Sequence, residues 1–385
     1  MDVSKFWKIP LKIFGMTFFA LVSFLVLMFL FTTFFISAGI GVGAMFGRKD
    51  LAELVTTEEQ NYAFVSGKRD SKNLLVSLPV QGLILGSPPQ EISASTMAWF
   101  NATYGYSIQK ALEKASDDNQ VKGIFLHIQS PGGTIFGSMA IHEGIKSFQM
   151  ATGKPVLVYI EGLSASGAVM AMAGADAIYA DYGSYVGSIG VLGAALTYFD
   201  EPTALEGGIL GGGIVTRGGI ERTVISAGRG KDLGNPFRRA TDEELNNLQK
   251  GADIEYDNFV RHVAKNRNIS EAVIRERMGA QIFDNRTAQD FGLIDGTLNQ
   301  NEALAKLADM AGISEDFQLV RPRRASTRMW QELFFSMAGR AAADETSRTV
   351  LHRHLCLNAG RMPMAYYGDI QTLCAEFGMK PRTEP

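Results

Sequence analysis

The sequence predicts an α/β fold, in which helices pack against a largely parallel or mixed sheet, preceded by a membrane anchor. Two observations carry this prediction. From Asn73 onward, short apolar runs alternate with segments of helical periodicity, which is typical of βα units. Before that point, residues 13–47 contain no charged side chain. Because 46% of the 385 residues are hydrophobic, the composition also excludes a disordered chain.

The uncharged N-terminal range is expected to cross a membrane once. Residues 16–36 are rich in Phe, Leu, Val and Met, and about 20 apolar residues are enough to span the hydrocarbon core. A cleavable signal peptide would have a shorter apolar region of about 7–15 residues. We therefore expect an uncleaved anchor over residues 1–49 and a polar linker over 50–72. Three lysines precede the span and two basic residues follow it, so charge favours a cytoplasmic N-terminus only slightly.

Charge and motif content exclude several classes of partner. With 37 basic and 40 acidic side chains, the net charge is −3, and no basic face dominates, so we expect no nucleic-acid partner. The sequence has neither an HExxH motif nor a Cys/His cluster with metal-ligand spacing. We therefore expect no metal and no cofactor.

The expected elements alternate along the chain. A Thr-Asp-Glu-Glu sequence at residue 241 predicts a capping box at the start of a helix. Tight turns are expected at 130–133 and 162–166. The predicted strands are 74–85 (with a turn), 121–129, 155–161 and 177–180, and the predicted helices are 107–115, 136–148, a small-residue helix ending at 175, and 241–263.

The two predicted turns have residues suited to catalysis. The glycines of Ser130-Pro-Gly-Gly let the backbone approach a ligand closely. In Ser164-Ala-Ser-Gly-Ala, Ser166 lies where a strand gives way to a helix, with small neighbours and a helix N-terminus behind it. The turns are one βα unit apart, so both are expected at the same sheet edge, with Ser166 as nucleophile and both turns as oxyanion donors. Ser164 is interpreted as a structural turn residue.

A serine nucleophile needs a base, and the sequence limits the choice. No histidine occurs between residues 143 and 261, while His127 and His142 fall in a predicted strand and helix, where packing is the simpler interpretation. Lys231 is the first lysine after Ser166. A lysine can act as base when burial and nearby positive charge lower its pKa well below about 10.4. A solvated surface lysine is the alternative.

Several segments together resemble one protease family. The chain is similar to the signal peptide peptidase A group of the S49 serine proteases, whose catalytic domain shares its fold with crotonases and the Clp protease. The similarity implies a peptidase domain over residues 73–312. The segments that carry it are Ile124 to Gly133, Ser164 to Asp181, Gly187-Ser-Ile-Gly-Val191, Lys231-Asp232 with Arg238 and the Thr241 helix start, and Asp284 to Asp295.

The resemblance assigns roles to individual residues. It implies Ser166 as nucleophile, Lys231 as base, the backbones at Gly133 and Gly167 as the oxyanion hole, and Ser188 as the residue that orients the lysine. For Ser188, a turn-stabilising hydroxyl is the alternative. It further implies cleavage of signal-peptide remnants or other apolar membrane-proximal peptides, on the extracytoplasmic side of the inner membrane. Single-unit relatives form homo-oligomeric rings in which adjacent subunits can complete the Ser/Lys dyad.

Two regions lie outside this pattern. The glycine-rich stretch 207–219 is expected to be a flexible loop or a strand connection, and residues 313–385 are expected to form a helical C-terminal extension. Two other functions stay open at this point. One is a crotonase-type acyl-CoA enzyme, because the fold also offers two N–H donors to a thioester, and the other is a catalytically inactive membrane scaffold.

Overall fold

The computed structural model describes residues 62–88, 102–199, 204–207, 213–215, 223–323 and 364–368. The expected anchor over residues 1–49, and the linker as far as residue 61, lie outside this part of the chain. Within the described ranges, no helix has both the length and the hydropathy that a bilayer crossing requires.

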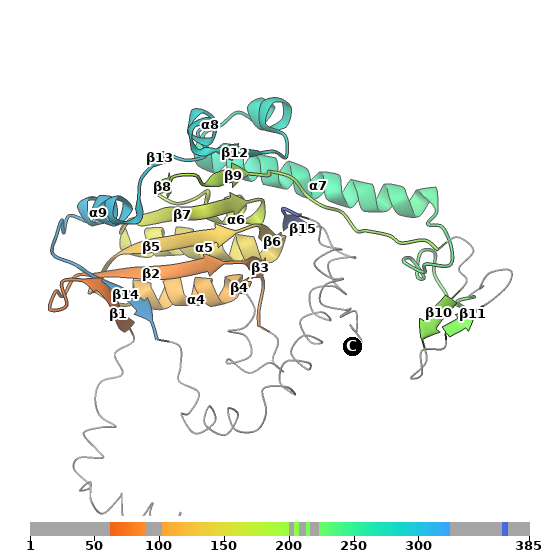
Figure 1. Ribbon diagram of the computed structural model, residues 1–385, viewed down its shortest axis with the longest axis horizontal. Helices are drawn as coiled ribbons and strands as arrows, with labels where there is room; N and C mark the ends of the chain where they lie inside the picture. The colour runs from red at the N-terminus through yellow and green to blue at the C-terminus, as the bar shows by residue number, and fades with distance from the viewer. Residues whose placement is uncertain are drawn as a thin grey trace, which may run out of the picture. The chain divides into compact units, whose positions relative to one another are not determined.

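The central layer is a sheet whose inner strands run parallel to one another (Figure 1). These strands are apolar along most of their length, as expected for a sheet covered on both faces. In spatial order the strands are β1 (Tyr62–Gly67), β14 (Gln318–Pro322), β2 (Leu74–Gln81), β5 (Val121–Ser130), β7 (Val156–Ala165), β8 (Ala177–Ala180) and β13 (Gly296–Thr297).

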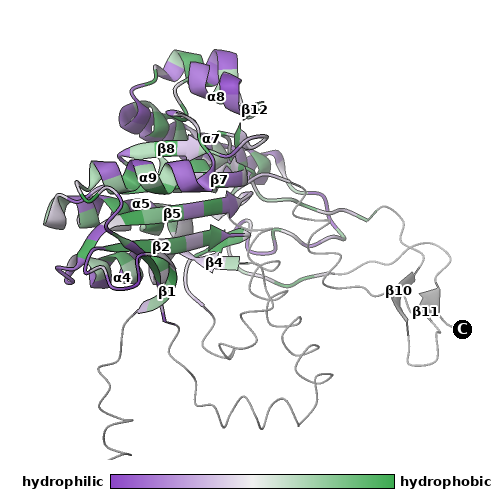
Figure 2. Cartoon of the chain, turned by 60° about the vertical axis from the view of Figure 1, so that its left-hand side comes forward, coloured by the Kyte–Doolittle hydropathy of each residue, from purple (hydrophilic) through white to green (hydrophobic). Residues whose placement is uncertain are grey.

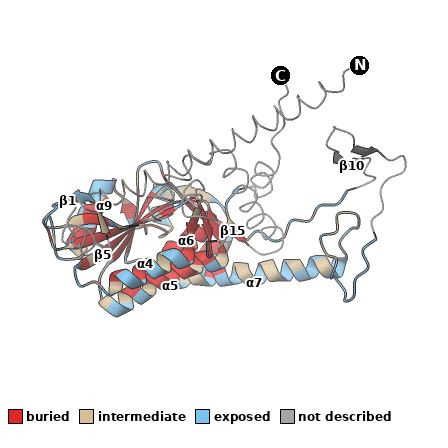
Figure 3. Ribbon diagram, turned by 90° about the horizontal axis from the view of Figure 1, so that it is seen from below, coloured by how far each residue is buried: buried red, intermediate tan, exposed pale blue. Residues whose placement is uncertain are grey.

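Side chains of this sheet alternate between two hydrophobic cores. In β5, Ile124 and Leu126 belong to one core and Phe125 to the other, which is the period-two pattern of a strand. The first core is covered by α4 (Gly105–Ser116), α5 (Ile135–Thr152) and α6 (Gly167–Met172), and the second by α9 (Gln300–Met310). Figure 2 shows the hydrophobic colour concentrated in these central strands, and Figure 3 shows α4 and α5 on one face and α9 on the other.

A second, smaller sheet forms beside the ends of the central strands. Its order is β15 (Met364–Tyr366), β6 (Gly132–Thr134), β3 (Leu83–Leu85) and β4 (Ala102–Tyr104). The prediction of a turn at 130–133 is therefore partly wrong. Its second half belongs to strand β6, which lies between β15 and β3. These partners come from distant segments, which local sequence patterns do not reveal.

The turn predicted at 162–166 also differs from the structure. Strand β7 continues through Ala165, because residues 163–165 pair with β9 (Tyr185–Gly187) after the pairing with β8 has ended. β9 pairs in turn with β12 (Ile282–Asp284), which leads into α8 (Asn285–Asp290). The strand predicted at 177–180 is confirmed as β8.

The predicted helix at 241–263 is confirmed as α7 (Asp242–Arg267). The Thr241 side chain accepts from the Glu244 N–H, and the Glu244 side chain accepts from the Thr241 N–H, so the predicted capping box is present. A π-helical segment (Val273–Met278) follows it. Of the glycine-rich stretch 207–219, the structure describes only Gly207 and residues 213–215. There, β10 (Ala204–Gly207) and β11 (Gly213–Val215) form an antiparallel pair, and the rest of the stretch lies outside the described residues.

The sheet also extends beyond the range 73–312 expected for the peptidase domain. β1 lies in the expected linker and β14 in the expected C-terminal extension, and the two strands pair with each other. The described pieces of the extension, residues 313–323 and 364–368, contain strands β14 and β15 rather than the expected helices. The rest of the extension lies outside the described residues.

Candidate active site

Ser166 lies at a sharp junction between β7 and α6. Its backbone angles, φ 55° and ψ −116°, are unusual for a residue with a side chain and cost about 1–3 kcal/mol. The Ser166 N–H donates to the Gly187 carbonyl at 2.8 Å, and its own carbonyl accepts from the Met170 N–H at 3.1 Å. Its Oγ donates to the Gly190 carbonyl at 3.4 Å. A strained serine between a strand and a helix is the arrangement of a nucleophile elbow.

The two predicted turns meet next to this serine. Ser130 of β5 and Ser164 of β7 are paired in register, so the segments that follow them lie side by side. A Cβ added to Gly167 would lie 3.1 Å from the Gly133 nitrogen, and one added to Gly132 would lie 2.6 Å from the Gly167 nitrogen. Only glycines permit this approach of the two backbones. Gly133 and Gly167 thus converge beside Ser166.

Residues 187–190 form a further wall of the site. Gly187 and Gly190 bond to the Ser166 N–H and Oγ, respectively. Between them, Ser188 has φ 59° and is 7% exposed, and its N–H donates to the Gln281 carbonyl at 2.6 Å. The structure therefore brings the segment that contains Ser188 to the serine turn, which we define as residues 164–168.

Lys231 lies elsewhere, in an exposed turn that we call the lysine segment, residues 227–234. The neighbouring Asp232 accepts from Arg238 at 2.7 and 2.8 Å, and Arg238 also donates to Glu244 at 2.7 and 2.9 Å. The Arg238 guanidinium, together with the Thr241 N–H, lowers the pKa of Glu244 to about 2. Because Glu244 belongs to the capping box of α7, the lysine segment is tied to the beginning of that helix.

Near its other end, helix α7 contacts α6, the helix that follows the serine turn. The His262 Nε2 lies 2.9 Å from the carbonyl of Met170, one turn of α6 after Ser166. From Glu244 to His262 the helix rises roughly 27 Å at about 1.5 Å per residue. The buried residues of α7 are Phe259, Val260 and Val263, so its N-terminal half is exposed (Figure 3). Among the described residues, no hydrogen bond joins the Lys231 amine to Ser166 or Ser188.

Both histidines considered as alternative bases have other partners. The His127 Nε2 lies 2.6 Å from a carboxylate oxygen of Glu161. The His142 ring packs edge-on against His262, with 4.4 Å between ring centroids. Burial, aided by His262, lowers the pKa of His142 to about 4. Both contacts fit the packing roles that the sequence favoured for them.

Ser164 differs from Ser166 in its contacts. It is fully buried, and its Oγ donates to the Met172 sulfur at 3.3 Å. This contact fits the structural role expected for Ser164.

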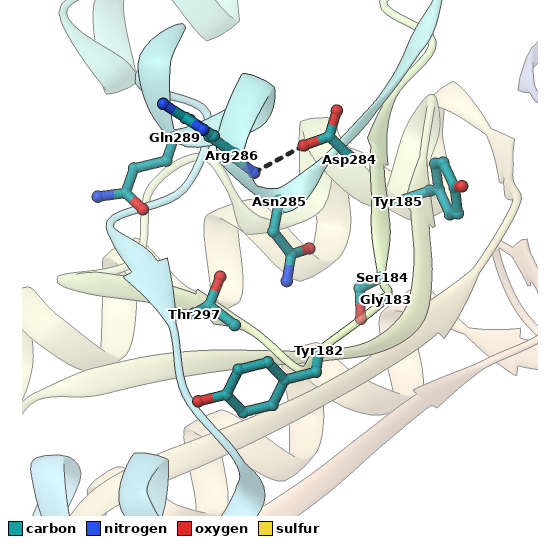
Figure 4. A pocket seen from close by; sticks show the side chains of 9 residues that line it. All are labelled: Tyr182, Gly183, Ser184, Tyr185, Asp284, Asn285, Arg286, Gln289 and Thr297. Atoms are coloured by element: carbon teal, nitrogen blue, oxygen red, sulfur yellow. Dashed lines mark hydrogen bonds between the residues drawn. The ribbon is translucent and has the colours of Figure 1, made fainter.

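A surface pocket near β9 and α8 lies apart from these residues (Figure 4). The Asp284 carboxylate there accepts from the Arg286 N–H at 2.9 Å, which caps α8. The pocket contains none of the site residues predicted from the sequence; it is lined by Tyr182, Gly183, Ser184, Tyr185, Asp284, Asn285, Arg286, Gln289 and Thr297.

No group of His, Cys, Asp and Glu side chains among the described residues is arranged to hold a metal ion.

Sequence reasoning missed two parts of the site. Strand β15 pairs with β6 directly beside the converging glycines, and Leu192 bonds to β15 from the opposite side. A three-residue strand has too few residues to show a periodicity, so no local signal indicated it.

Comparisons with known proteins match this chain to two protease families. The model of "Peptidase family S49" matches residues 149–314, and that of "Clp protease" matches residues 100–179. The Clp protease match agrees with the α/β fold that the sequence predicted.

Three proteins with similar sequences have names that describe proteases or peptidases. A "Putative protease" of Methanocaldococcus jannaschii is 37% identical over 214 residues, 56% of this chain and 63% of that protein. A "Putative signal peptide peptidase SppA" of Enterococcus faecium is 30% identical over 196 residues, 51% and 53% of the two chains. A "Putative protease" of Synechocystis is 30% identical over 210 residues, 54% and 70%. The chain thus spans 53–63% of the first two relatives.

Proposed function

Because the chain belongs to peptidase family S49, we propose that it is a membrane-anchored serine endopeptidase in which Ser166 is the nucleophile and Lys231 the base. The observation that carries this proposal is the strained backbone of Ser166 beside the converging glycine backbones. Strain at a buried serine is retained where the surrounding structure fixes it, and such residues cluster at active sites.

The proposed reaction is acyl transfer. The Ser166 Oγ attacks a peptide carbonyl carbon while the neutral Lys231 amine takes its proton, and the Gly133 and Gly167 N–H groups stabilise the oxyanion. The lysine then gives the proton to the leaving amine, which leaves an ester on Ser166. Water, deprotonated by the same lysine, attacks the carbonyl carbon of this ester. The lysine then returns the proton to the Ser166 Oγ as the ester bond breaks, which releases the acid and restores the neutral amine. Ser188 orients the lysine amine through its hydroxyl.

The base must be brought to the serine by a second subunit in this proposal. A lysine acts as a base only where its surroundings remove its proton, and burial is the usual cause. Lys231 is exposed, and so is the N-terminal half of α7 that carries its segment, with Leu245 47% and Ile254 49% exposed. We infer that these surfaces pack against a neighbouring copy in a homo-oligomeric ring and complete a dyad there.

The proposed substrates are signal-peptide remnants and other apolar peptides close to the membrane. The uncharged residues 13–47 would hold the enzyme in the inner membrane, with the catalytic domain on the extracytoplasmic side. This placement would bring the catalytic domain close to its substrates, because the enzyme's anchor and the apolar peptides would lie in the same bilayer.

The experiment uses the full chain in detergent with a fluorophosphonate probe and an apolar peptide. We expect Ser166→Ala to abolish labelling and to reduce peptide hydrolysis by roughly a thousandfold or more. Lys231→Ala should produce a comparable loss. Ser164→Ala is the matched control, because it removes a hydroxyl two residues away and should keep both signals.

Three results would reject the proposal. Hydrolysis that persists undiminished in Ser166→Ala would exclude this serine as nucleophile. Coenzyme A binding without peptide hydrolysis would favour the crotonase-type enzyme, and inertness in both assays would favour the scaffold.

A further inference from the structure

The first turn of α5 begins directly after one of the two proposed oxyanion donors. Gly133 lies in β6, and the next residue, Thr134, is the N-cap of α5. The Thr134 Oγ1 accepts from the Gly137 N–H and donates to the Ile84 carbonyl, both at 3.3 Å. The start of α5 is therefore joined to β6 through the chain and to β3 through this side chain.

Ser138, one turn into α5, has no exposed surface. Its Oγ donates to the Thr134 carbonyl, four residues earlier, at 3.0 Å. A serine that bonds in this way slightly destabilises a helix, and alanine is the better helix former. The stability of α5 therefore does not explain why a hydroxyl is buried at residue 138.

The same hydroxyl oxygen lies against the second proposed oxyanion donor, Gly167. A Cβ added to Gly167 would be 2.4 Å from the Ser138 Oγ and 3.1 Å from the Gly133 nitrogen. The Ser138 Oγ thus fills the space that a side chain at residue 167 would take. It does so on the face of Gly167 that the Gly133 backbone also approaches.

We propose that the Ser138 hydroxyl is a positioning group that sets the spacing of the two oxyanion donors. Its hydrogen bond fixes it to Thr134, which follows Gly133, and its oxygen supports the backbone of Gly167. The inference rests on the proposed function, because the two glycines donate to an oxyanion only if Ser166 is the nucleophile.

Removal of this hydroxyl should affect the transition state more than substrate binding. Without the Ser138 Oγ, Gly167 loses the atom that limits its movement toward α5, and its N–H can turn away from the oxyanion. The negative charge on this oxygen develops only in the transition state, so a displaced donor stabilises that state less. The loss should therefore appear in kcat and leave KM unchanged.

The test compares two full-chain variants of the same helix, Ser138→Ala and Thr152→Ala. Thr152 is the matched control, because its Oγ1 makes the same kind of bond, to the Phe148 carbonyl at 2.8 Å, in the last turn of α5. The helix rises about 21 Å from Ser138 to Thr152. For each variant we would measure kcat and KM on an apolar peptide, the rate of Ser166 labelling by a fluorophosphonate, and the melting temperature.

We expect Ser138→Ala to lower kcat and the labelling rate about tenfold, at unchanged KM. Its melting temperature should not fall, because alanine favours the helix. Thr152→Ala should show the opposite pattern. Thr152 also accepts from the Lys154 N–H at 3.1 Å, so this variant should melt at a lower temperature and keep the wild-type kcat.

A second comparison tests the contact itself. Gly167→Ala places a Cβ against the Ser138 Oγ and should be less stable than the wild type. Adding Ser138→Ala removes the atom that lies nearest to this Cβ, so the double variant should melt at a higher temperature than Gly167→Ala alone. An equal or lower melting temperature of the double variant would overturn the inference.

The outcomes separate this inference from the proposed function. An unchanged kcat in Ser138→Ala, or equal losses of kcat in Ser138→Ala and Thr152→Ala, would overturn the inference while Ser166 remains the nucleophile. A lower kcat together with a lower melting temperature in Ser138→Ala would also overturn it, because that pattern indicates a structural role. Hydrolysis that persists undiminished in Ser166→Ala would instead overturn the proposed function.

Discussion

The serine turn and the lysine segment differ in how the single chain holds them. The serine turn is buried, and its backbone is bonded to β9 and to α6. The lysine segment is exposed, and the side-chain bonds of Asp232 and Arg238 fix it to the N-terminal end of α7. The fold of a single chain thus buries and positions Ser166. Lys231 is held near the start of α7 but lacks the burial that a lysine base requires.

The largest effect is expected from combining the two inactive variants. Ser166→Ala and Lys231→Ala should each be inactive alone. When they are coexpressed in one ring, sites that take an intact serine from one subunit and an intact lysine from its neighbour should recover about a quarter of wild-type peptide hydrolysis. If the dyad forms within one chain, coexpression restores no activity. That result would contradict the inference that the lysine reaches the serine only across a subunit contact.

A glycine of the site should be far less tolerant than a glycine outside it. Gly132 has a φ of +96°. In Gly132→Ala, the new Cβ would lie 2.6 Å from the Gly167 nitrogen and 2.8 Å from the Ala165 oxygen. We expect a roughly hundredfold to thousandfold loss of hydrolysis, because the oxyanion donors would be displaced. Gly162→Ala shares a positive φ of +79° but has open space around it. It should lose about 1 kcal/mol of stability and keep its activity; similar losses of activity in both variants would contradict the assignment.

The anchor of the lysine segment should have a moderate effect. Arg238→Gln removes the ion pairs with Asp232 and Glu244 that hold this segment at α7. We expect kcat to fall about tenfold because the lysine is misplaced. Arg229→Gln is the control, because Arg229 is 89% exposed and makes one 3.4 Å ion pair with Glu243. Equal kcat values for the two variants would show that the anchor does not position the lysine.

The smallest effect concerns the contact of α7 with α5, where the rings of His262 and His142 pack together. Burial lowers the pKa of His142 to about 4 and also lowers that of His262. The unfolded chain binds protons at these residues below about pH 6.5, whereas the folded chain binds one at His142 only near pH 4. The free energy of unfolding should therefore fall as the pH falls from 6.5 toward 4, by on the order of 1–3 kcal/mol.

Urea unfolding of the wild type and of His142→Asn at pH 7.5 and 5 measures this dependence. The variant should lose less stability between the two pH values than the wild type. An equal loss in both proteins would assign the pH dependence to other groups.

The sequence alone determined the elements whose signals are local. The Thr241 capping box begins α7, and the apolar runs of β2, β5 and β8 appear where they were expected, because side-chain periodicity and capping depend on neighbouring residues. The position of Ser166 between a strand and a helix was predicted for the same reason.

Tertiary structure decided the parts that depend on distant partners. β6 and β15 are strands only because each pairs with the other and with segments far away in the chain, and β1 and β14 join the sheet in the same way. The exposure of Lys231 follows from where α7 is anchored, which no local pattern reveals. Hydrogen bonding between strands and the burial of a charge are properties of the assembled chain, so they cannot be deduced from a residue and its neighbours in sequence.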